Sequence, residues 1–361
     1  MQRILVINPG STSTKLAYFE GEDLLHGVSI THSGEELKPF KGVMDQFDYR
    51  KAAIVSWIEE LKLQGFDAIV GRGGLLRPMA SGTYEVDEVM KDDLLNAVSG
   101  DHASNLGGLL ADSLAKDYGV KAYIVDPVSV DEFTPVARIS GLKEIERRSL
   151  AHALNIKAIA LAHAKKMDKD IHQCNFIVAH LGGGISVASL KEGKIVDTND
   201  ANEMGPFSPE RTGQLPVGGL AKLIFDGYYE NWDACRKDLR GNGGLMGYLG
   251  TSDLREVEQR IQEGDQKAEL IAEAMFYQIA KEIGACSAVL QGKVDAILLT
   301  GGLAHSKRLC NYVEGYVGYI APVHVYAGED EMRSLCLGTL RVLRGEEEAR
   351  NYEKEVLNEN I

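Results

Sequence analysis

The chain has 361 residues, of which 44% are hydrophobic and 25% charged, and its formal net charge is −14. This length favours two domains, because single cores stop growing at about 250–300 residues. The acidic balance disfavours a nucleic-acid-binding protein, which needs a basic surface. No apolar stretch is long enough to cross a bilayer, and the short apolar start at residues 4–7 lacks signal-peptide features, so we expect a cytoplasmic protein without a membrane partner.

The cysteines are scattered and odd in number, and none form a C-x-x-C pair. They are Cys174, Cys235, Cys286, Cys310 and Cys336. This pattern predicts neither a disulfide framework nor a zinc site, and we expect small side chains that fill the core.

The first element is an apolar strand at residues 4–7, followed by a glycine turn and a second strand, and residues 176–187 repeat this pattern. Matched positions lie 172 residues apart, as for Gly10 and Gly182. In a Rossmann or Walker loop the glycines would open a helix, whereas here β-rich residues follow them. The repeat therefore predicts two β-hairpins whose tips offer N–H groups and hydroxyls to phosphate oxygens. An ordinary hairpin is the alternative for either copy alone.

Between and after the hairpins, helical and strand patterns alternate. Helices are predicted at residues 49–63, 101–118, 148–166 and 269–291, strands at 68–70, 122–125 and 296–299, and a charged helical tail from residue 331. This alternation indicates an α/β protein, in which ligands bind beyond the carboxyl ends of strands. Asn8, Arg72, Asp126, His180 and the Gly301-Gly302 pair stand at such ends, and we expect them to converge on one cleft. The acidic run at 346–348 is interpreted as a solvated helix face.

Two arginines lie in glycine-rich loops, Arg72 at residues 71–74 and Arg211 at residues 205–213. Phosphoryl transfer needs positive charge on the transferred group, although a loop arginine is more often a solvated surface residue. His152 is by default a satisfied histidine on the face of the helix predicted from residue 148.

Six segments together carry a family resemblance. They are residues 7–15, 126–133, 151–155, 180–184, 205–211 and 328–332. The chain resembles the acetokinase family of acetate, propionate and butyrate kinases over essentially its whole length. This resemblance implies two duplicated actin-like ATPase domains of the ribonuclease H-like type, with a nucleotide cleft between them. The first domain would comprise residues 1–150 plus 327–361 and the second residues 151–326.

The resemblance also implies the site residues. The catalytic set would be Arg72, Asp126, His152 and Arg211. ATP or ADP would be bound by Asn8, Gly10, Ser11, Ser13, Lys15, His180, Gly182, Gly183, Gly184, Asp253, Arg255, Gly301, Gly302, Leu303 and Ala304. Mg²⁺ would be approached by Asn8 and by Asp330 or Glu331, with the neighbouring Glu329 leaving the assignment ambiguous. A homodimer or a multiple of dimers is implied as well.

Three departures from the acetate kinase pattern concern the substrate. Ile156 stands where acetate kinases have a second histidine, Gly183 where they have asparagine, and residues 302–306 differ from their Gly-Ile-Gly-Glu-Asn run. These departures agree with the butyrate branch, so the expected reaction is ATP-dependent phosphorylation of butyrate. Branched-chain or propionate kinases remain alternatives.

Two further alternatives follow from the residues themselves. A carboxylate is already ionised at neutral pH and needs charge neutralisation, which two arginines would supply, whereas an alcohol needs a base. Asp126 could be that base, so a sugar or small-alcohol kinase is the second enzyme hypothesis. A nucleotide-switched binding protein of the actin or heat-shock chaperone type is disfavoured, because no appended peptide-binding domain is visible.

Overall fold

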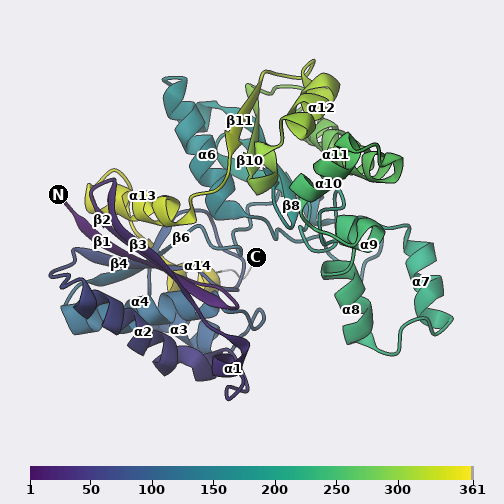
Figure 1. Ribbon diagram of the computed structural model, residues 1–361. Helices are drawn as coiled ribbons and strands as arrows, with labels where there is room; N and C mark the ends of the chain where they lie inside the picture. The colour runs from purple at the N-terminus through teal and green to yellow at the C-terminus, as the bar shows by residue number, and fades with distance from the viewer. Residues whose placement is uncertain (359–361) are drawn as a thin grey trace. The chain divides into compact units, whose positions relative to one another are not determined.

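The computed structural model describes residues 1–358, and its contacts divide the chain into two compact units. Unit 1 comprises residues 1–131 together with the segment from Asp330 onward, and unit 2 comprises residues 132–329. Figure 1 shows that each unit has its own sheet with helices packed on it. Within residues 1–358 no helix combines the length and the apolar character that a membrane span requires.

Unit 1 is built on a seven-stranded mixed sheet in the order β12-β5-β6-β4-β1-β2-β3. Its strands are β1 (Arg3–Pro9), β2 (Ser13–Glu20), β3 (Asp23–Thr31), β4 (Ala68–Arg72), β5 (Thr83–Glu85), β6 (Lys121–Val125) and β12 (Arg350–Asn351). Its helices are α1 (Gly34–Leu37), η1 (Met44–Gln46), α2 (Phe47–Glu60), α3 (Glu88–Leu95), α4 (Asn105–Tyr118), α13 (Glu331–Leu343) and α14 (Tyr352–Asn358). Helices α2, α3 and α4 cover one face, and α13 packs on β1, β4 and β6.

Unit 2 has a five-stranded sheet in the order β11-β10-β7-β8-β9. Its strands are β7 (Asn175–Leu181), β8 (Ile185–Lys191), β9 (Lys194–Thr198), β10 (Ala296–Gly301) and β11 (Val323–Ala327). Its helices are α5 (Pro135–Arg138), α6 (Ala153–Lys166), η2 (Ile171–Gln173), α7 (Val217–Phe225), α8 (Trp232–Arg240), α9 (Gly244–Leu249), α10 (Leu254–Gln262), α11 (Gln266–Val289), η3 (Gly302–His305) and α12 (Lys307–Val317).

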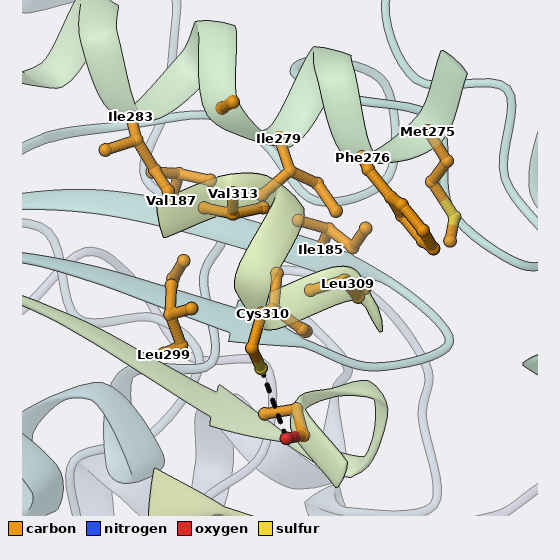
Figure 2. Close-up of a cluster of buried hydrophobic side chains, with 14 of the residues drawn as sticks. Ile185, Val187, Met275, Phe276, Ile279, Ile283, Leu299, Leu309, Cys310 and Val313 are labelled. Carbon is orange, nitrogen blue, oxygen red and sulfur yellow. Dashed lines mark hydrogen bonds between the residues drawn. The ribbon is translucent and has the colours of Figure 1, made fainter. Parts of the chain in front are cut away.

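The core of unit 2 lies between its sheet and helix α11, which carries a buried stripe facing the strands. Figure 2 shows Phe276, Ile279 and Ile283 of α11 pointing toward Ile185 and Val187 of β8, and all five are at most 1% exposed. Full burial of such side chains contributes about 1.5–3 kcal/mol each. The strands of the second hairpin are therefore firmly supported on the face that α11 covers.

The two predicted hairpins are present. Strands β1 and β2 pair antiparallel with Asn8 opposite Lys15, and β7 and β8 pair antiparallel with His180 opposite Ser186. In each unit a third antiparallel strand follows, β3 or β9, and a register shift interrupts the pairing in both copies. The duplication read from the sequence is thus a repeated three-stranded meander.

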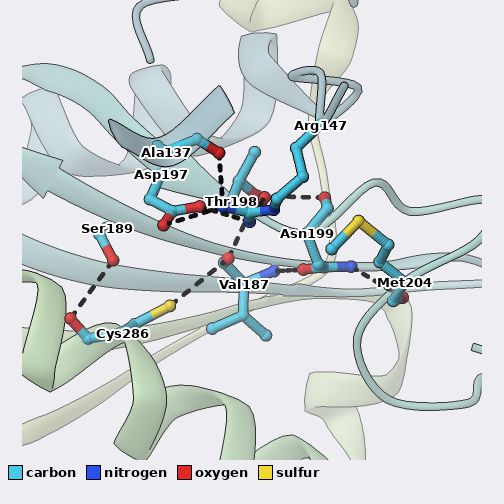
Figure 3. A network of polar contacts seen from close by, with 9 residues as sticks. All are labelled: Ala137, Arg147, Val187, Ser189, Asp197, Thr198, Asn199, Met204 and Cys286. Atoms are coloured by element: carbon cyan, nitrogen blue, oxygen red, sulfur yellow. Dashed lines mark hydrogen bonds and ion pairs between the residues drawn. The ribbon is translucent and has the colours of Figure 1, made fainter. Parts of the chain in front are cut away.

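The helix predicted from residue 148 begins only at Ala153. Arg147 instead lies in an irregular segment, where its guanidinium donates to Ala137 O and Thr198 O and pairs with Asp197, as Figure 3 shows. His152 occupies the N-cap position with φ −77° and ψ 58°, and so precedes the helix. The expectation that His152 stands on a helix face is wrong, because polar partners on β9 hold the preceding residues in a non-helical path.

The tail is also less regular than expected. The helical prediction from residue 331 holds for α13 and α14, but strand β12 and a turn separate them. Glu347 accepts a hydrogen bond from Thr83 N at 3.1 Å and pairs with Arg341 at 2.8 Å. The acidic run is therefore not a solvated helix face, and at least one of its carboxylates ties the tail to β5.

The compact units differ from the predicted domains at their boundaries. Residues 132–150 belong to unit 2, because Lys157 forms a buried ion pair with Glu132 at 2.6 Å and Arg147 is bound to β9. All five cysteines are buried and free, as the sequence predicts. Burial raises the pKa of the Cys286 thiol to about 12.

Candidate functional site

In unit 1 three candidate residues stand at the carboxyl ends of adjacent parallel strands. Asn8 lies near the end of β1, Arg72 ends β4, and Asp126 directly follows β6. The register aligns Ile7 with Gly71 and Arg72 with Val125, so the three ends meet at one edge of the sheet. This is the placement that the strand pattern predicts.

Glu331, the first residue of α13, joins two of these side chains. Its Oε1 lies 2.5 Å from Arg72 Nη1, and its Oε2 accepts a hydrogen bond from Asn8 Nδ2 at 2.7 Å. Arg72 and Glu331 are 26% and 17% exposed, so water only partly screens this charged pair. Asn8 and Arg72, two predicted site residues from different strands, are therefore held by one carboxylate.

Close packing beneath β4 fixes the position of Arg72. A Cβ on Gly71 would lie 2.0 Å from Gly107 O, and a Cβ on Gly107 would lie 2.2 Å from Arg72 O. Only glycine at both positions lets β4 and α4 approach this closely. The backbone that carries Arg72 is thereby rigidly seated.

Asp126 adopts a backbone conformation that few non-glycine residues use, with φ at 39°. Its Oδ1 accepts hydrogen bonds from Ser81 Oγ at 2.6 Å and from Gly82 N at 2.8 Å, and the residue is only 5% exposed. Strain of this kind is held in place by surrounding contacts and is frequent at functional sites. In the structure Asp126 organises the loop that precedes β5.

The tip of the first hairpin exposes several polar groups. Ser11 and Lys15 are exposed and Ser13 is half-buried, while Gly10 N donates to Ser13 O at 2.7 Å and closes the turn. Because Asn8 and Lys15 are directly paired, their side chains share one face of the hairpin.

Sequence reasoning missed one group near Arg72. The pKa of His102 is lowered, first by desolvation and then by the positive charge of Arg72. A neutral imidazole can accept or donate a hydrogen bond beside an arginine. His102 falls inside the helix predicted from residue 101, whereas α4 begins only at Asn105, so the sequence carries almost no signal for such a role.

In unit 2 two histidines stack against each other. The rings of His152 and His180 lie 3.9 Å apart at 14° to one another. His152 Nδ1 is 2.9 Å from Ser186 Oγ, and His180 Nδ1 is 2.9 Å from Asn155 Oδ1. Ser186 and Asn155 thus orient the two rings, and neither was singled out from the sequence as a site residue.

Arg211 packs closely against the second hairpin. A Cβ on Gly184 would lie 2.2 Å from Arg211 Nη1 and 2.5 Å from its Cζ, and the same Nη1 donates to Ala201 O at 2.8 Å. Burial lowers the pKa of Arg211, and the nearby positive charge of Arg240 lowers it further. The guanidinium remains charged, because an arginine pKa stays far above neutrality.

The glycine segment after β10 lies beside the second hairpin. Strands β7 and β10 are parallel, with Thr300 aligned to His180, and a Cβ on Gly301 would lie 2.5 Å from Leu181 O. Gly301 has φ at 89°, and Gly302, Leu303 and Ala304 form the first turn of η3. Gly182, Gly183 and Gly184 at the hairpin tip therefore neighbour the 301–304 segment.

Asp253 and Arg255 lie at the start of α10 and bind each other. Asp253 caps the helix through Arg255 N, and the two side chains pair at 2.6 Å. Hydrogen bonds from Arg255 hold the pKa of Asp253 at about 2.

The three acidic residues at positions 329–331 have different partners. Glu329 lies 3.5 Å from His180 Nε2, Asp330 caps α13 through Arg333 N, and Glu331 binds Arg72 and Asn8. Mg²⁺ prefers hard oxygen ligands and is usually held by one or two carboxylates plus phosphates. The carboxylate of Glu331 fits that requirement; Asn8 turns its Nδ2 to that carboxylate and would bind the ion through its amide oxygen, while Asp330 uses one carboxylate oxygen in the cap. Within residues 1–358, no three His, Cys, Asp or Glu side chains form a metal cluster by themselves.

Comparison with known proteins decides the family. Residues 142–313 match the model of the acetokinase family. The chain is 52% identical to a probable butyrate kinase 2 of Caldanaerobacter subterraneus, over 98% of this chain and 100% of that protein. It is 49% identical to butyrate kinase 2 of Clostridium acetobutylicum, over 97% of this chain and 99% of that protein. The chain belongs to the acetokinase family.

The fold agrees with solved structures of this family. Acetate kinase from Porphyromonas gingivalis superposes with a TM-score of 0.78 at 19% identity, over 95% of this chain and 100% of that one. The predicted family and the α/β fold with two duplicated actin-like units are thereby confirmed. The predicted cleft, domain limits and residue roles stay predictions.

Proposed function

We propose that this acetokinase-family protein phosphorylates the carboxylate of a short-chain fatty acid with ATP: butanoate + ATP gives butanoyl phosphate + ADP, reversibly. The observation that carries this proposal is the identity of about half of all residues with two butyrate kinases over nearly the whole chain. The residues at the two sheet edges support it, because arginine and histidine side chains lie there beside glycine-rich hairpins.

The proposed step is a direct in-line transfer. A carboxylate oxygen of the acid attacks the γ-phosphorus, the bond between the γ-phosphorus and the β,γ-bridging oxygen breaks, and ADP leaves with that oxygen. No proton has to be removed, because the acid is ionised at neutral pH. Catalysis then consists of positioning and of stabilising charge on the transferred group.

Within this proposal the arginines carry the charge. Arg72 and Arg211 bind the carboxylate and then the transferring phosphoryl group. Arg211 is suited to this role because it is partly buried, and a positive charge shielded from water stabilises a developing negative charge more strongly than a solvated one. His152, oriented by Ser186, donates to an equatorial oxygen, and Asp126 holds its loop in place.

The nucleotide would occupy the glycine segments. The tips of both hairpins offer N–H groups to the phosphates, and residues 301–304 with Asp253 and Arg255 lie around the adenosine. Mg²⁺, when bound, neutralises the β- and γ-phosphates. Asn8 and Glu331 would hold it. The carboxylate of Glu331 would then be shared between the cation and Arg72.

A panel of acids tests the proposal. We would trap acyl phosphate as hydroxamate with Mg-ATP and acetate, propionate, butyrate, isobutyrate, isovalerate or glycerol, and follow ADP release in parallel. We expect the highest kcat/KM with butyrate. One methylene separates substrates by only about 1–3 kcal/mol, so a maximum at isobutyrate, isovalerate or propionate would reassign the chain preference. ADP release with glycerol and no hydroxamate from any acid would refute the carboxylate kinase.

Two substitutions test the assigned roles. Arg211→Ala should lower kcat by at least about 100-fold, because removing one such stabilising group costs several kcal/mol. His152→Ala should lower kcat more than it raises KM for ATP. Arg236→Ala is the matched control, since Arg236 is an exposed residue of α8 that pairs with the equally exposed Asp233. Near-native activity of the Arg211 variant would remove Arg211 from the site.

We also propose that the protein forms a homodimer or a multiple of dimers. Helix α7 has the sequence VGGLAKLIF and no buried residue, with Val217 81% and Phe225 89% exposed. An exposed apolar surface of this kind commonly marks a protein contact, and a second copy is the commonest partner. Light scattering should give at least twice the monomer mass, and Phe225→Glu should shift it toward the monomer. A monomeric wild type at micromolar concentration would contradict this proposal.

A further inference from the structure

Beneath the tip of the first hairpin lies an arginine that neither the motifs nor the proposed mechanism uses. Arg50, in the first turn of α2, is 0% exposed, so its guanidinium is fully enclosed. Its Nη1 donates to Ser13 O at 2.9 Å and to Thr14 Oγ1 at 3.0 Å, and its Nη2 donates to Ser11 O at 3.2 Å. Nε and Nη2 both donate to Gln46 Oε1, at 3.0 and 2.9 Å. These contacts use all five N–H donors of the guanidinium.

Every one of these acceptors is neutral. They are two backbone carbonyls, one hydroxyl and one amide oxygen, so the hydrogen bonds satisfy the guanidinium without neutralising it. Desolvation lowers the pKa of Arg50, but an arginine remains protonated at neutral pH. Enclosing a charge in this way is costly, and a well-packed apolar side chain would be cheaper. A packing role alone therefore gives no reason for an arginine here.

These contacts fix the direction in which the peptide groups of the hairpin tip point. The carbonyls of Ser11 and Ser13 point at Arg50, and the carbonyl of Thr12 accepts from His32 N at 2.8 Å. In a trans peptide the C=O and the following N–H point in opposite directions. The N–H of Thr12 shares its peptide with Ser11 O and therefore points away from Arg50, as a backbone anion site requires, whereas the N–H of Ser13 points away from His32 N.

The side chains of the hairpin divide in the same way. Thr14, which is fully buried, contacts Arg50 and also lies 2.8 Å from His32 Nε2. Lys15, the next residue, pairs with Asn8 and so points to the opposite face of β2. Arg50 thus supports the hairpin from behind, while Asn8 and Lys15 lie on its other face.

The second hairpin contains an equivalent device made from different residues. Ser11 and Gly183 are 172 residues apart, the offset of the whole repeat. Where Arg50 holds Ser11 O, Ser208 Oγ donates to Gly183 O. In both copies a side chain from outside the hairpin holds the same tip carbonyl. Such a contact in each copy indicates that the direction of this peptide matters to both hairpins.

We propose that Arg50 is a positioning residue for nucleotide phosphates: it turns the carbonyls of Ser11 and Ser13 inward, so that the outward N–H of Thr12 and the enclosed positive charge both favour a polyphosphate. This inference rests on the proposed binding of ATP phosphates at this hairpin. It assigns to Arg50 an effect on the phosphates of the nucleotide and none on its adenosine.

The ratio of two affinities tests the inference. We would measure Kd for Mg-ATP and for adenosine by calorimetry on the purified full-length protein, with circular dichroism and Tm as checks of folding. Arg50→Met should weaken ATP binding at least tenfold and adenosine binding less than twofold. Arg50→Lys keeps the charge but cannot form the five-donor contact, so its Kd for Mg-ATP should lie between those of the wild type and of Arg50→Met. In steady-state kinetics KM for ATP should rise by a larger factor than kcat falls.

Lys51→Met is the matched control, since Lys51 is the next residue of α2 and binds Ser113 and Asp117 away from the hairpin. Lys51→Met should leave the ratio of the Kd for Mg-ATP to the Kd for adenosine unchanged. A folded Arg50→Met protein with an unchanged ratio, or with equal losses for both ligands, would overturn the inference. If that variant does not fold, the same ratio in Arg50→Lys decides. A protein that phosphorylates no acid but shows the lowered ratio would refute the proposed function and leave this inference standing.

Discussion

Gly184→Ala should damage activity far more than stability. The added Cβ would lie 2.2 Å from Arg211 Nη1, whereas ordinary van der Waals contact begins at 3.4 Å, so the guanidinium must move by more than about 1 Å. A displacement of about 1 Å at a reacting centre can cost about 100-fold in rate. Gly184 does not have a positive φ, so alanine fits its backbone without strain.

The stability cost of this substitution can be bounded. Moving the guanidinium disrupts its 2.8 Å hydrogen bond to Ala201 O, and a hydrogen bond of a charged group is worth about 1.5–3 kcal/mol. We therefore expect kcat/KM for the acid to fall about 100-fold, while the free energy of unfolding falls by at most about 3 kcal/mol. The assays are hydroxamate formation and urea denaturation.

Two comparisons make the result interpretable. At Gly183 a new Cβ would meet its nearest atom, Glu210 Oε2, only at 3.8 Å, so Gly183→Ala should lose much less activity than the Gly184 variant. At Gly284 of α11 a Cβ meets nothing within 4 Å, and alanine there should stabilise the helix by about 0.5–1 kcal/mol. Equal activity losses at positions 183 and 184 would refute the argument from the collision with Arg211.

Two further predictions concern charge and pH. Glu331→Gln should raise the Mg²⁺ concentration needed for half-maximal activity at least several-fold, because it removes the carboxylate beside Asn8 and Arg72; an unchanged requirement in a Mg²⁺ titration would exclude Glu331 as a ligand. Burial lowers the pKa of His163 below its usual value, so at mildly acidic pH the unfolded state binds a proton more readily than the folded state does. The free energy of unfolding should therefore fall as pH drops below about 6.5. In urea denaturation between pH 7.5 and 5.5, His163→Phe should reduce this dependence of the free energy of unfolding on pH, whereas His172→Gln, at an exposed position, should not. The same pH dependence in wild type and in His163→Phe would contradict the assignment to His163.

The hairpins could be predicted because their information is local. Alternating apolar residues, a glycine turn and a second strand occupy adjacent positions, and the repeat at a fixed offset supplied a second reading of the same pattern. The ends of β1, β4 and β6 were predicted for the same reason. The start of α6 was not predicted correctly. Arg147 is held outside the helix by Asp197, 50 positions away, and such a distant contact leaves no trace in the helical periodicity.

Arg50 shows the limit of sequence reasoning at the site. On an amphipathic helix an arginine is normally solvated, and the acceptors that enclose this one come from a hairpin 37 and 39 residues earlier. Ser186 and Asn155, which orient the two stacked histidines, are likewise ordinary residues until the sheet brings them together. The candidate site residues were chosen by motif, whereas the residues that orient them belong to no motif.

The return of the chain to unit 1 has a consequence for synthesis on the ribosome. Tyr352 is fully buried in the core of unit 1 and its hydroxyl donates to Asp93, while β12 pairs with β5. Unit 2 is one continuous stretch, complete once residue 329 has emerged. Unit 1 is thus synthesised first but can be completed only after the last segment has emerged, and until then α3 and β5 lack their contacts with Tyr352 and β12.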